Sequence, residues 1–212
     1  MKINLKSLVG VLSVAATAVS VTSCSQSEEM LPVGNTRAAN VVTVSGVINT
    51  NMTWSASNEY HLNGKVYVSG GATLTIQPGT KIVGLYNDVP AKASALVITR
   101  NGKINAAGTA SNPIVMRAES NHQYPGGWGG FVVLGNAPIN QTNNPVIEGI
   151  ESDELPADVD IHYGGSNAND NSGTIQYVRV EYAGANVSQD NELNSFTFGG
   201  VGAGTTFDHC QA

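Results

Sequence analysis

The sequence predicts an all-β fold, a right-handed, single-stranded parallel β-helix with three sides, and three observations lead to it. Short β-branched runs recur at nearly regular intervals from residue 60 onward, which is the pattern of many short strands. The segments between these runs bend the chain at glycine corners instead of reversing it in hairpin turns. No window shows the spacing of apolar residues that an amphipathic helix requires. Three strands and three corners would make a coil of roughly 22 to 30 residues, and stacked coils would share one apolar core.

The expected strands follow one another in a regular order. Residues 66–68, 74–76 and 81–83 come first, and positions 66, 74 and 82 lie eight residues apart. After an insertion at residues 85–94 the pattern resumes, and further strands are expected at residues 96–98, 103–105, 114–116, 131–134, 146–147, 175–182, 196–198 and 205–210. Residues 74–76 and 96–98 are similar and lie 22 residues apart, so we interpret them as equivalent strands of successive coils.

The first 23 residues are predicted to be a secretory signal that is not part of the fold. Lys2 and Lys6 form a basic start, and residues 8–21 form an apolar run that is too short to span a membrane well. A cysteine, Cys24, closes the segment where an ordinary signal would have an Ala-x-Ala-like site. Lipidation of Cys24 would leave one cysteine in the mature chain, Cys210, which is expected to be an inert core thiol.

Residues 24–40 show no apolar periodicity and are predicted to be a flexible tether, whereas residues 41–212 are predicted to form the β-helix domain. Residues 205–212 have the pattern of a strand without a polar cap. Because an uncapped β end promotes aggregation, we expect further coils of a longer protein, or another subunit, to cover it.

The composition favours short strands and argues against nucleic acid as a partner. Charged residues make up only 12% of the chain and glycine occurs 24 times, which suits short strands and tight turns better than helices. Removal of residues 1–23, which contain two lysines and no acidic residue, would change the net charge from −6 to −8. An acidic chain without a cluster of Lys and Arg is not expected to bind nucleic acid.

The N-terminal segment resembles the start of bacterial lipoproteins. Residues 21–24, Val-Thr-Ser-Cys, are similar to the lipobox, in which the cysteine is lipidated and becomes the mature N-terminus. The acidic pair Glu28 and Glu29 is similar to the surface-export signal of Bacteroidetes-type lipoproteins, although a solvated acidic linker is the alternative interpretation. The resemblance implies a protein that is anchored to the outer membrane through Cys24 and displayed on the cell surface.

A second resemblance concerns the predicted domain. Residues 74–80, Leu-Thr-Ile-Gln-Pro-Gly-Thr, resemble a corner found in a family of Bacteroidetes-type β-helix lipoproteins, and further similar segments lie at residues 106–109, 112–114, 127–138, 172–184 and 198–205. The likeness covers about residues 54–210. It implies the fold and the export route, and it implies no particular activity.

Aromatic side chains offer a candidate ligand platform. Trp128, Tyr124 and Tyr163 are the candidate ligand-binding residues, and Trp54 and Tyr60 are further possible members. Trp128 lies among glycines, which is typical of a ring packed over a bare backbone. Packing is therefore the alternative interpretation of these rings.

The loop at residues 167–173 is the most oxygen-rich segment and offers a candidate calcium site at Asn169, Asp170 and Asn171. Calcium takes six to eight oxygen ligands. The loop lacks the terminal bidentate Glu of an EF-hand, and Asn and Asp are also the ordinary residues of structural turns. No other cofactor is expected, because the four histidines share no metal-ligand spacing.

Two further groups of charged residues have structural alternatives. Glu148, Glu151, Asp153 and Glu154 lie in an expected insertion at residues 148–172, where a glycoside hydrolase could use paired carboxylates, but such insertions are usually solvated. In the strand pattern at residues 178–181, the side chains of the arginine and the glutamate should point outward and form a cross-strand ion pair. This ion pair is expected in preference to a catalytic role, in which the arginine would be the proton-abstracting base of a lyase.

The leading functional hypothesis is a lipid-anchored, non-enzymatic surface module that is adhesin-like or binds glycans. Its ligand would be a surface glycan or a host or protein partner, which would contact the flat sheet faces and the insertions at residues 85–94 and 148–172. The rival hypothesis is a polysaccharide lyase or glycoside hydrolase on the same scaffold, which rests on fold-level analogy.

Overall fold

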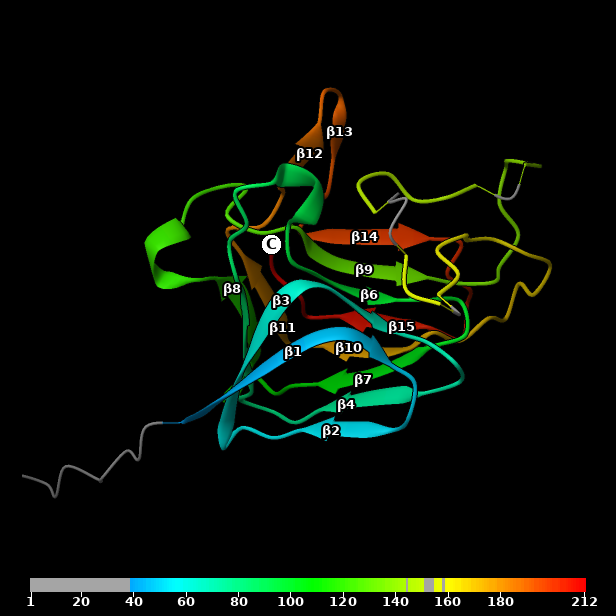
Figure 1. Ribbon diagram of the computed structural model, residues 1–212. Coiled ribbons are helices and arrows are strands. Elements are labelled where there is room, and N and C mark those ends of the chain that lie inside the picture. Colours follow the sequence, from blue (N-terminus) through cyan, green and yellow to red (C-terminus); the bar gives the residue numbers. More distant parts are fainter. Residues whose placement is uncertain (1–38, 144, 151–154, 158) are drawn as a thin grey trace, which may run out of the picture. The chain divides into compact units, whose positions relative to one another are not determined.

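The computed structural model describes residues 39–143, 145–150, 155–157 and 159–212, and these residues form a three-sided parallel β-helix (Figure 1). The predicted fold class is confirmed: within these ranges only two short 3-10 helices, η1 (Pro90–Lys92) and η2 (Ser120–His122), accompany the strands. Within the same ranges, no helix is long and apolar enough to cross a membrane. The predicted signal and Cys24 lie outside the described residues.

One side of the β-helix is a five-stranded parallel sheet. Its strands, in spatial order, are β15 (Thr206–Asp208), β10 (Gly173–Gln176), β7 (Lys103–Ala107), β4 (Thr73–Ile76) and β2 (Met52–Trp54). Each strand pairs with a strand from the preceding or following coil, so the backbone bonds run between coils. This is the pairing that a solenoid requires.

The other two sides belong to one bent eight-stranded sheet. The long strand β3 (Asn58–Val68) turns the corner, because residues 59–62 pair with β5 (Lys81–Gly84) and residues 65–68 pair with β6 (Ala95–Ile98). One side continues through β8 (Ile114–Ala118) and β11 (Val178–Glu181), and the other through β9 (Gly130–Leu134) and β14 (Phe196–Gly199). Strand β1 (Asn40–Ile48) lies beside β3 along both sides. A small antiparallel hairpin, β12 (Asn186–Ser188) with β13 (Asn191–Glu192), projects from the last corner (Figure 1).

Coil length varies, and one predicted repeat is therefore wrong. Leu74 pairs with Met52, 22 residues earlier, and with Ile104, 30 residues later. Leu96 pairs with Val66 and not with Leu74. Residues 74–76 and 96–98 thus lie on different sides of the same coil, because the insertion at residues 85–94 lengthens that coil and a fixed interval no longer marks equivalent positions.

Two predicted strands also differ from the structure. Residues 175–182, expected as one run, form β10 and β11 with a corner at Tyr177, whose φ of 49° is left-handed. Residues 146–147 form only an isolated antiparallel bridge, from Val146 to His162. In both places the apolar pattern indicates burial correctly but does not distinguish a continuous strand from a corner or from a packed loop.

Alternating apolar side chains fill the interior of the β-helix. In β7 the inward residues Ile104 and Ala106 are buried and the outward residues Lys103 and Asn105 are exposed, as the two-residue period of a strand dictates. The largest fully buried side chains of this core come from all three sides: Trp54, Trp128, Phe131, Leu62, Leu74, Ile76, Ile82, Leu96, Ile98, Ile104, Ile114 and Met116. Cys210 packs half-buried against this core, and burial raises the pKa of its thiol, as expected for an unreactive cysteine.

Two neighbouring strands on one side of the β-helix, β6 and β9, are buried on both faces. All residues of β6 and β9 are buried. Their outward side chains Val97 and Leu134 form a second apolar cluster with Ile150 and Ile161 from the insertion between β9 and β10. The expectation that flat sheet faces stay open to a ligand is therefore wrong for this side, because its outward residues are apolar and the insertion covers them.

The interior packing predicts a large effect of Ile104→Ala. The side chain is 1% exposed between β4 and β10, so its truncation leaves a cavity that costs about 2–5 kcal/mol of unfolding free energy. Urea unfolding measures this loss. The matched control is Lys103→Ala on the same strand, which should change the unfolding free energy by less than about 0.5 kcal/mol. A loss below about 1 kcal/mol for Ile104→Ala would contradict the described core.

Candidate functional site

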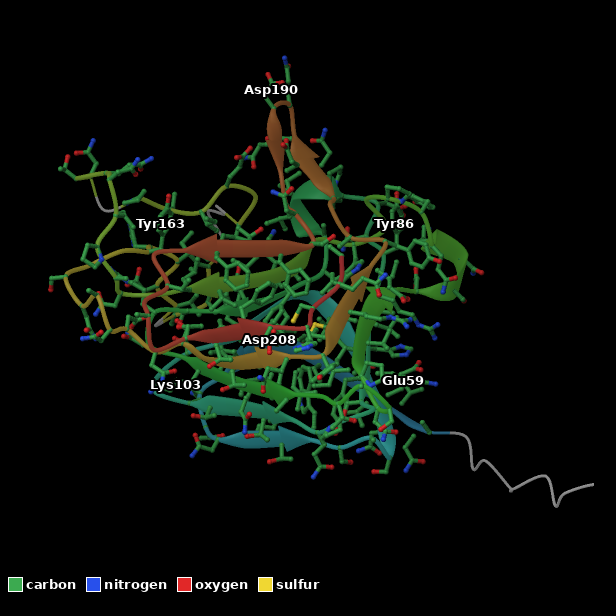
Figure 2. The ribbon with its side chains drawn as sticks, turned by 180° about the vertical axis from the view of Figure 1, so that it is seen from behind. Glu59, Tyr86, Lys103, Tyr163, Asp190 and Asp208 are labelled. Atoms are coloured by element: carbon green, nitrogen blue, oxygen red, sulfur yellow. The ribbon has the colours of Figure 1, made fainter. Side chains whose placement is uncertain are left out.

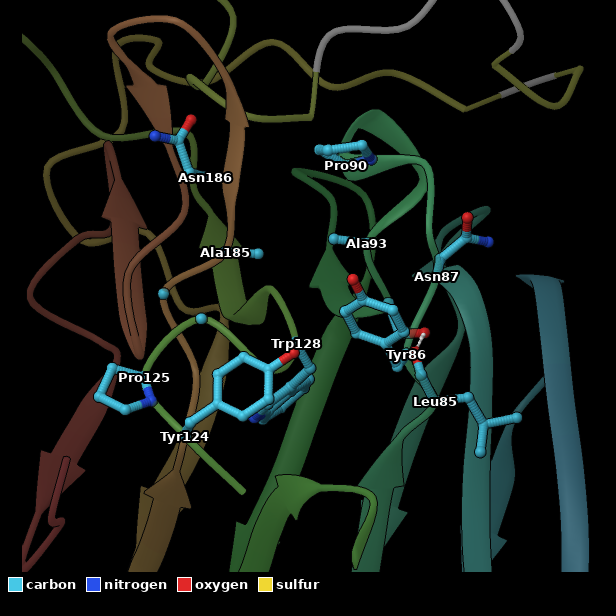
Figure 3. Close-up of a pocket in the computed structure, with 14 residues that line it drawn as sticks. Leu85, Tyr86, Asn87, Pro90, Ala93, Tyr124, Pro125, Trp128, Ala185 and Asn186 are labelled. Atoms are coloured by element: carbon cyan, nitrogen blue, oxygen red, sulfur yellow. Dashed lines mark hydrogen bonds between the residues drawn. The ribbon is translucent and has the colours of Figure 1, made fainter. Parts of the chain in front are cut away.

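Three loops from successive coils meet at one corner and leave a hollow of about 290 Å³, the corner groove (Figure 3). The loops follow β5, β8 and β11, and they lie together because these strands pair in register. The lining residues are Leu85, Tyr86, Asn87, Pro90, Ala93, Ser94, Tyr124, Pro125, Gly126, Gly127, Trp128, Gly184, Ala185 and Asn186. The insertion at residues 85–94, expected to offer contact surface, thus forms one wall.

Three rings form an aromatic cluster at the groove, consisting of Tyr86, His122 and Tyr124. Tyr86 and His122 stack with their centroids 3.9 Å apart and their planes 4° apart, and Tyr124 meets His122 edge-on at 5.9 Å. Tyr86 is 39% exposed and Tyr124 is 46% exposed. These exposed rings give the groove flat apolar surfaces with a hydroxyl at each rim.

Glu119 holds the aromatic cluster in place. Its Oε1 accepts a hydrogen bond from the backbone N–H of Tyr86 at 3.3 Å, which ties two successive coils together. The same Oε1 lies 2.8 Å from His122 Nδ1, although the contact lacks the angles of a hydrogen bond and leaves that nitrogen without one. The ring of His122 therefore lies between a carboxylate and two tyrosines.

The environment of Tyr124 raises the pKa of its hydroxyl. Desolvation, then charge repulsion from Tyr86 and a hydrogen bond with Tyr86, raise the pKa of Tyr124. Because the ordinary tyrosine pKa is already about 10, the Tyr124 hydroxyl is neutral at physiological pH. It can then both donate and accept hydrogen bonds.

Trp128 forms the floor of the groove and is 1% exposed. Its Nε1–H donates to the carbonyl oxygen of Glu181 at 2.9 Å. A Cβ at Gly84 would lie 2.7 Å from the Trp128 ring, so the ring lies directly on bare backbone. The glycine beneath it belongs to the neighbouring coil and not to the glycine-rich segment around Trp128. As a predicted ligand residue, Trp128 offers little surface.

The other predicted aromatic residues lie elsewhere. Tyr163 is half-buried over Gly199 and lines a second hollow beside Arg100, and Figure 2 shows Tyr163 and Tyr86 on opposite sides of the domain. Trp54 and Tyr60 stack on each other at 4.6 Å and are buried, so packing is their role. The structure thus brings Tyr124 and Trp128 together, leaves out Tyr163, and adds Tyr86 and His122.

The predicted calcium loop is held together by its own hydrogen bonds. The Oδ2 of Asp170 accepts from Ser172 Oγ at 3.2 Å, and the backbone N–H of Asn169 donates to Asn167 Oδ1 at 3.1 Å. Within the described ranges, no group of three or more His, Cys, Asp or Glu residues is placed to hold a metal ion. Calcium binding at Asn169, Asp170 and Asn171 stays a prediction that rests on the sequence.

The predicted charged residues form local pairs. Arg179 Nε donates to Glu181 Oε1 at 3.0 Å, so the expected ion pair lies within one strand and not across two, because residues two apart point to the same face. Glu148 Oε1 accepts from the backbone N–H of Glu192 at 3.2 Å. The remaining acidic candidates, Glu151, Asp153 and Glu154, lie outside the described residues.

A separate ion pair fastens the covering insertion. Asp160 pairs with Arg100, which also donates to the carbonyl oxygen of Gly164 at 3.1 Å. His162 donates its backbone N–H to Asp160 Oδ1 at 3.0 Å. Burial raises the pKa of Asp160, but hydrogen bonds from Arg100 and His162 and the charge of Arg100 outweigh it and lower the pKa below 3.8.

Comparison with known proteins gives one match. A family model described as a pectate-lyase-like β-helix domain matches residues 46–212. No curated protein and no solved structure shows a significant match.

The Asp160 contacts predict a pH-dependent contribution to stability. Because the folded-state pKa lies below the ordinary value, this contribution is present above the unfolded-state pKa and is lost as the pH falls through the folded-state pKa. Asp160→Asn should therefore lower the urea midpoint at neutral pH, and the difference from the original chain should vanish between about pH 4 and pH 2. Asp190→Asn, at the exposed hairpin tip (Figure 2), should show no such difference. A difference that grows on acidification would contradict the assignment.

Proposed function

Because the chain belongs to the family of pectate-lyase-like β-helix domains, we propose that it is a glycan-binding module whose binding site is the corner groove. The observation that carries the proposal is the pair of exposed rings, Tyr86 and Tyr124, at a hollow whose lining also includes Asn87 and Asn186. A sugar ring has apolar C–H faces and a rim of hydroxyls. It therefore needs flat apolar surfaces and groups that both donate and accept hydrogen bonds.

The rigidity of the site supports the same proposal. The groove walls begin at paired strands of three successive coils, and Glu119 and Trp128 fasten the loops to neighbouring coils. A site whose side chains are already held in place loses less conformational entropy on binding. A volume of about 290 Å³ lies at the lower end of small-molecule sites, which suits a short stretch of a glycan.

We also propose that the module is an adhesin-like lipoprotein on the outer cell surface, of the Bacteroidetes type. The support is the basic and apolar signal at residues 1–23 followed by Cys24 and the acidic pair Glu28 and Glu29. Each buried acyl CH₂ contributes about 0.8 kcal/mol, so several chains on one cysteine would hold the protein firmly on a bilayer. Residues 24–40 would then act as the tether between the lipid and the domain.

Polysaccharide cleavage is the second candidate function, and the description of the family is the observation that favours it. Fold-level likeness does not carry a reaction from one protein to another. The two candidates separate in one experiment, in which the purified domain is incubated with acidic and neutral polysaccharides. Release of unsaturated or reducing ends would overturn the binding-only function, and retention of uncleaved glycan would support it.

Tyr124→Ala should weaken glycan binding by roughly three- to tenfold, because it removes an aromatic surface worth about 0.5–1.5 kcal/mol beyond its buried area. Tyr124→Phe keeps the ring and should retain most of the affinity. Isothermal titration with a glycan identified on an array measures both variants. Tyr163→Ala tests the second hollow: if it abolishes binding while Tyr124→Ala does not, the binding site is not the corner groove.

Cys24→Ala in the full chain should move the protein from the membrane fraction to the soluble fraction after export, because the lipid attachment site is lost. Cys210→Ala is the matched control, since it removes the other cysteine, and it should leave the protein in the membrane fraction. Fractionation followed by immunoblotting measures both. Membrane retention of Cys24→Ala would place the anchor elsewhere.

A further inference from the structure

We infer that the corner groove selects uncharged glycans over uronic-acid glycans of the pectate type, an inference that rests on the proposed glycan-binding function. The lining of the groove is uncharged, and this property decides which chemical class of glycan the groove can bind.

None of the described residues that line the groove is charged. A bound carboxylate therefore finds no Lys or Arg partner, although Arg and Lys are the groups that bind carboxylates strongly. A carboxylate that loses water without gaining such a partner is costly. The polar side chains of the lining, such as those of Asn186 and Tyr124, are uncharged amides and hydroxyls, which match the neutral hydroxyls of a sugar.

Two lysines near the groove line a neighbouring hollow and not the groove itself. Lys92, on η1, and Lys65 line this neighbouring hollow, which shares Asn87 with the groove. Lys65 Nζ donates to the carbonyl oxygen of Ala91 at 2.5 Å. Near the groove, Arg179 pairs with Glu181, and the Nδ1 of His122 lies 2.8 Å from the Glu119 carboxylate.

The charge of the whole chain acts in the same direction. Its net charge is −6 at pH 7, so a polyanion is repelled before it reaches the groove, and added salt screens this long-range effect. The lack of a cationic partner for a carboxylate inside the groove acts at short range, and salt screens such short-range effects much less. The two contributions can therefore be separated by ionic strength.

The test compares pairs of oligosaccharides in which one member carries carboxylates and the other has neutral groups in their place. Oligogalacturonate is compared with its methyl ester, and oligoglucuronate with the matching glucose oligomer, by titration calorimetry at low salt and at 0.5 M NaCl. We expect the neutral member of any pair that binds to bind at least about tenfold more tightly at both salt concentrations, because an unpaired charged group costs this much or more. Equal or tighter binding of the acidic member would overturn the inference and leave the proposed function intact.

A variant of the groove that carries a cation should bind acidic glycans better than the original chain does. Asn186→Lys adds a cation to the groove lining and should raise the ratio of the affinity for the acidic member to that for the neutral one by about tenfold. The matched control is Asn105→Lys on the exposed face of β7, which adds the same charge to another side and should leave the ratio of affinities unchanged. If both variants change the ratio equally, net charge and not the groove sets the preference. If neither member of any pair binds, the proposed glycan-binding function itself fails.

Discussion

In-register pairing between successive coils is the constraint on which the rest of the structure depends. Backbone hydrogen bonds join β5 to β8 to β11 on one side and β6 to β9 to β14 on the next, so each coil must leave and rejoin the sheets at the same corner. Loops of different length are thereby stacked above one another. Tyr86, Tyr124 and Asn186 are far apart in sequence and meet only because the strands that precede them are paired.

The same constraint decides which surface is open. The side formed by β6 and β9 is apolar on both faces, and its outer face packs against Ile150 and Ile161 of the long insertion. Burial of this face follows from the hydrophobic effect, since exposed rows of Val and Leu would be unfavourable in water. The corner beside it carries the exposed tyrosines, and the groove therefore lies between loops and not on a flat sheet.

The site combines rigidity with a neutral, amphipathic lining. Trp128 closes the floor through a hydrogen bond to the next coil and a close contact with Gly84, and Glu119 links the loops that carry Tyr86 and His122. Parallel β-helices serve as scaffolds for different ligands and reactions, because a coil tolerates loop insertions without losing its paired strands. Ligand preference is therefore decided by a few loop side chains, which here carry aromatic rings and amides.

The short apolar runs determined the all-β class, and the glycine corners between them indicated the three-sided coil, since the strand pattern and the bend of a corner are local properties. The signal-like start and Cys24 can be recognised only in the sequence, because they lie outside the described residues. Only the tertiary structure decided which strands pair between coils. The resemblance of residues 74–76 to residues 96–98 gave a wrong pairing, because loop insertions change the length of a coil. Burial, and not residue type, distinguishes Trp54 and Trp128 from the exposed Tyr124. Partners such as Tyr86 and His122 come from different coils, and no local pattern encodes a contact that depends on how whole coils are stacked.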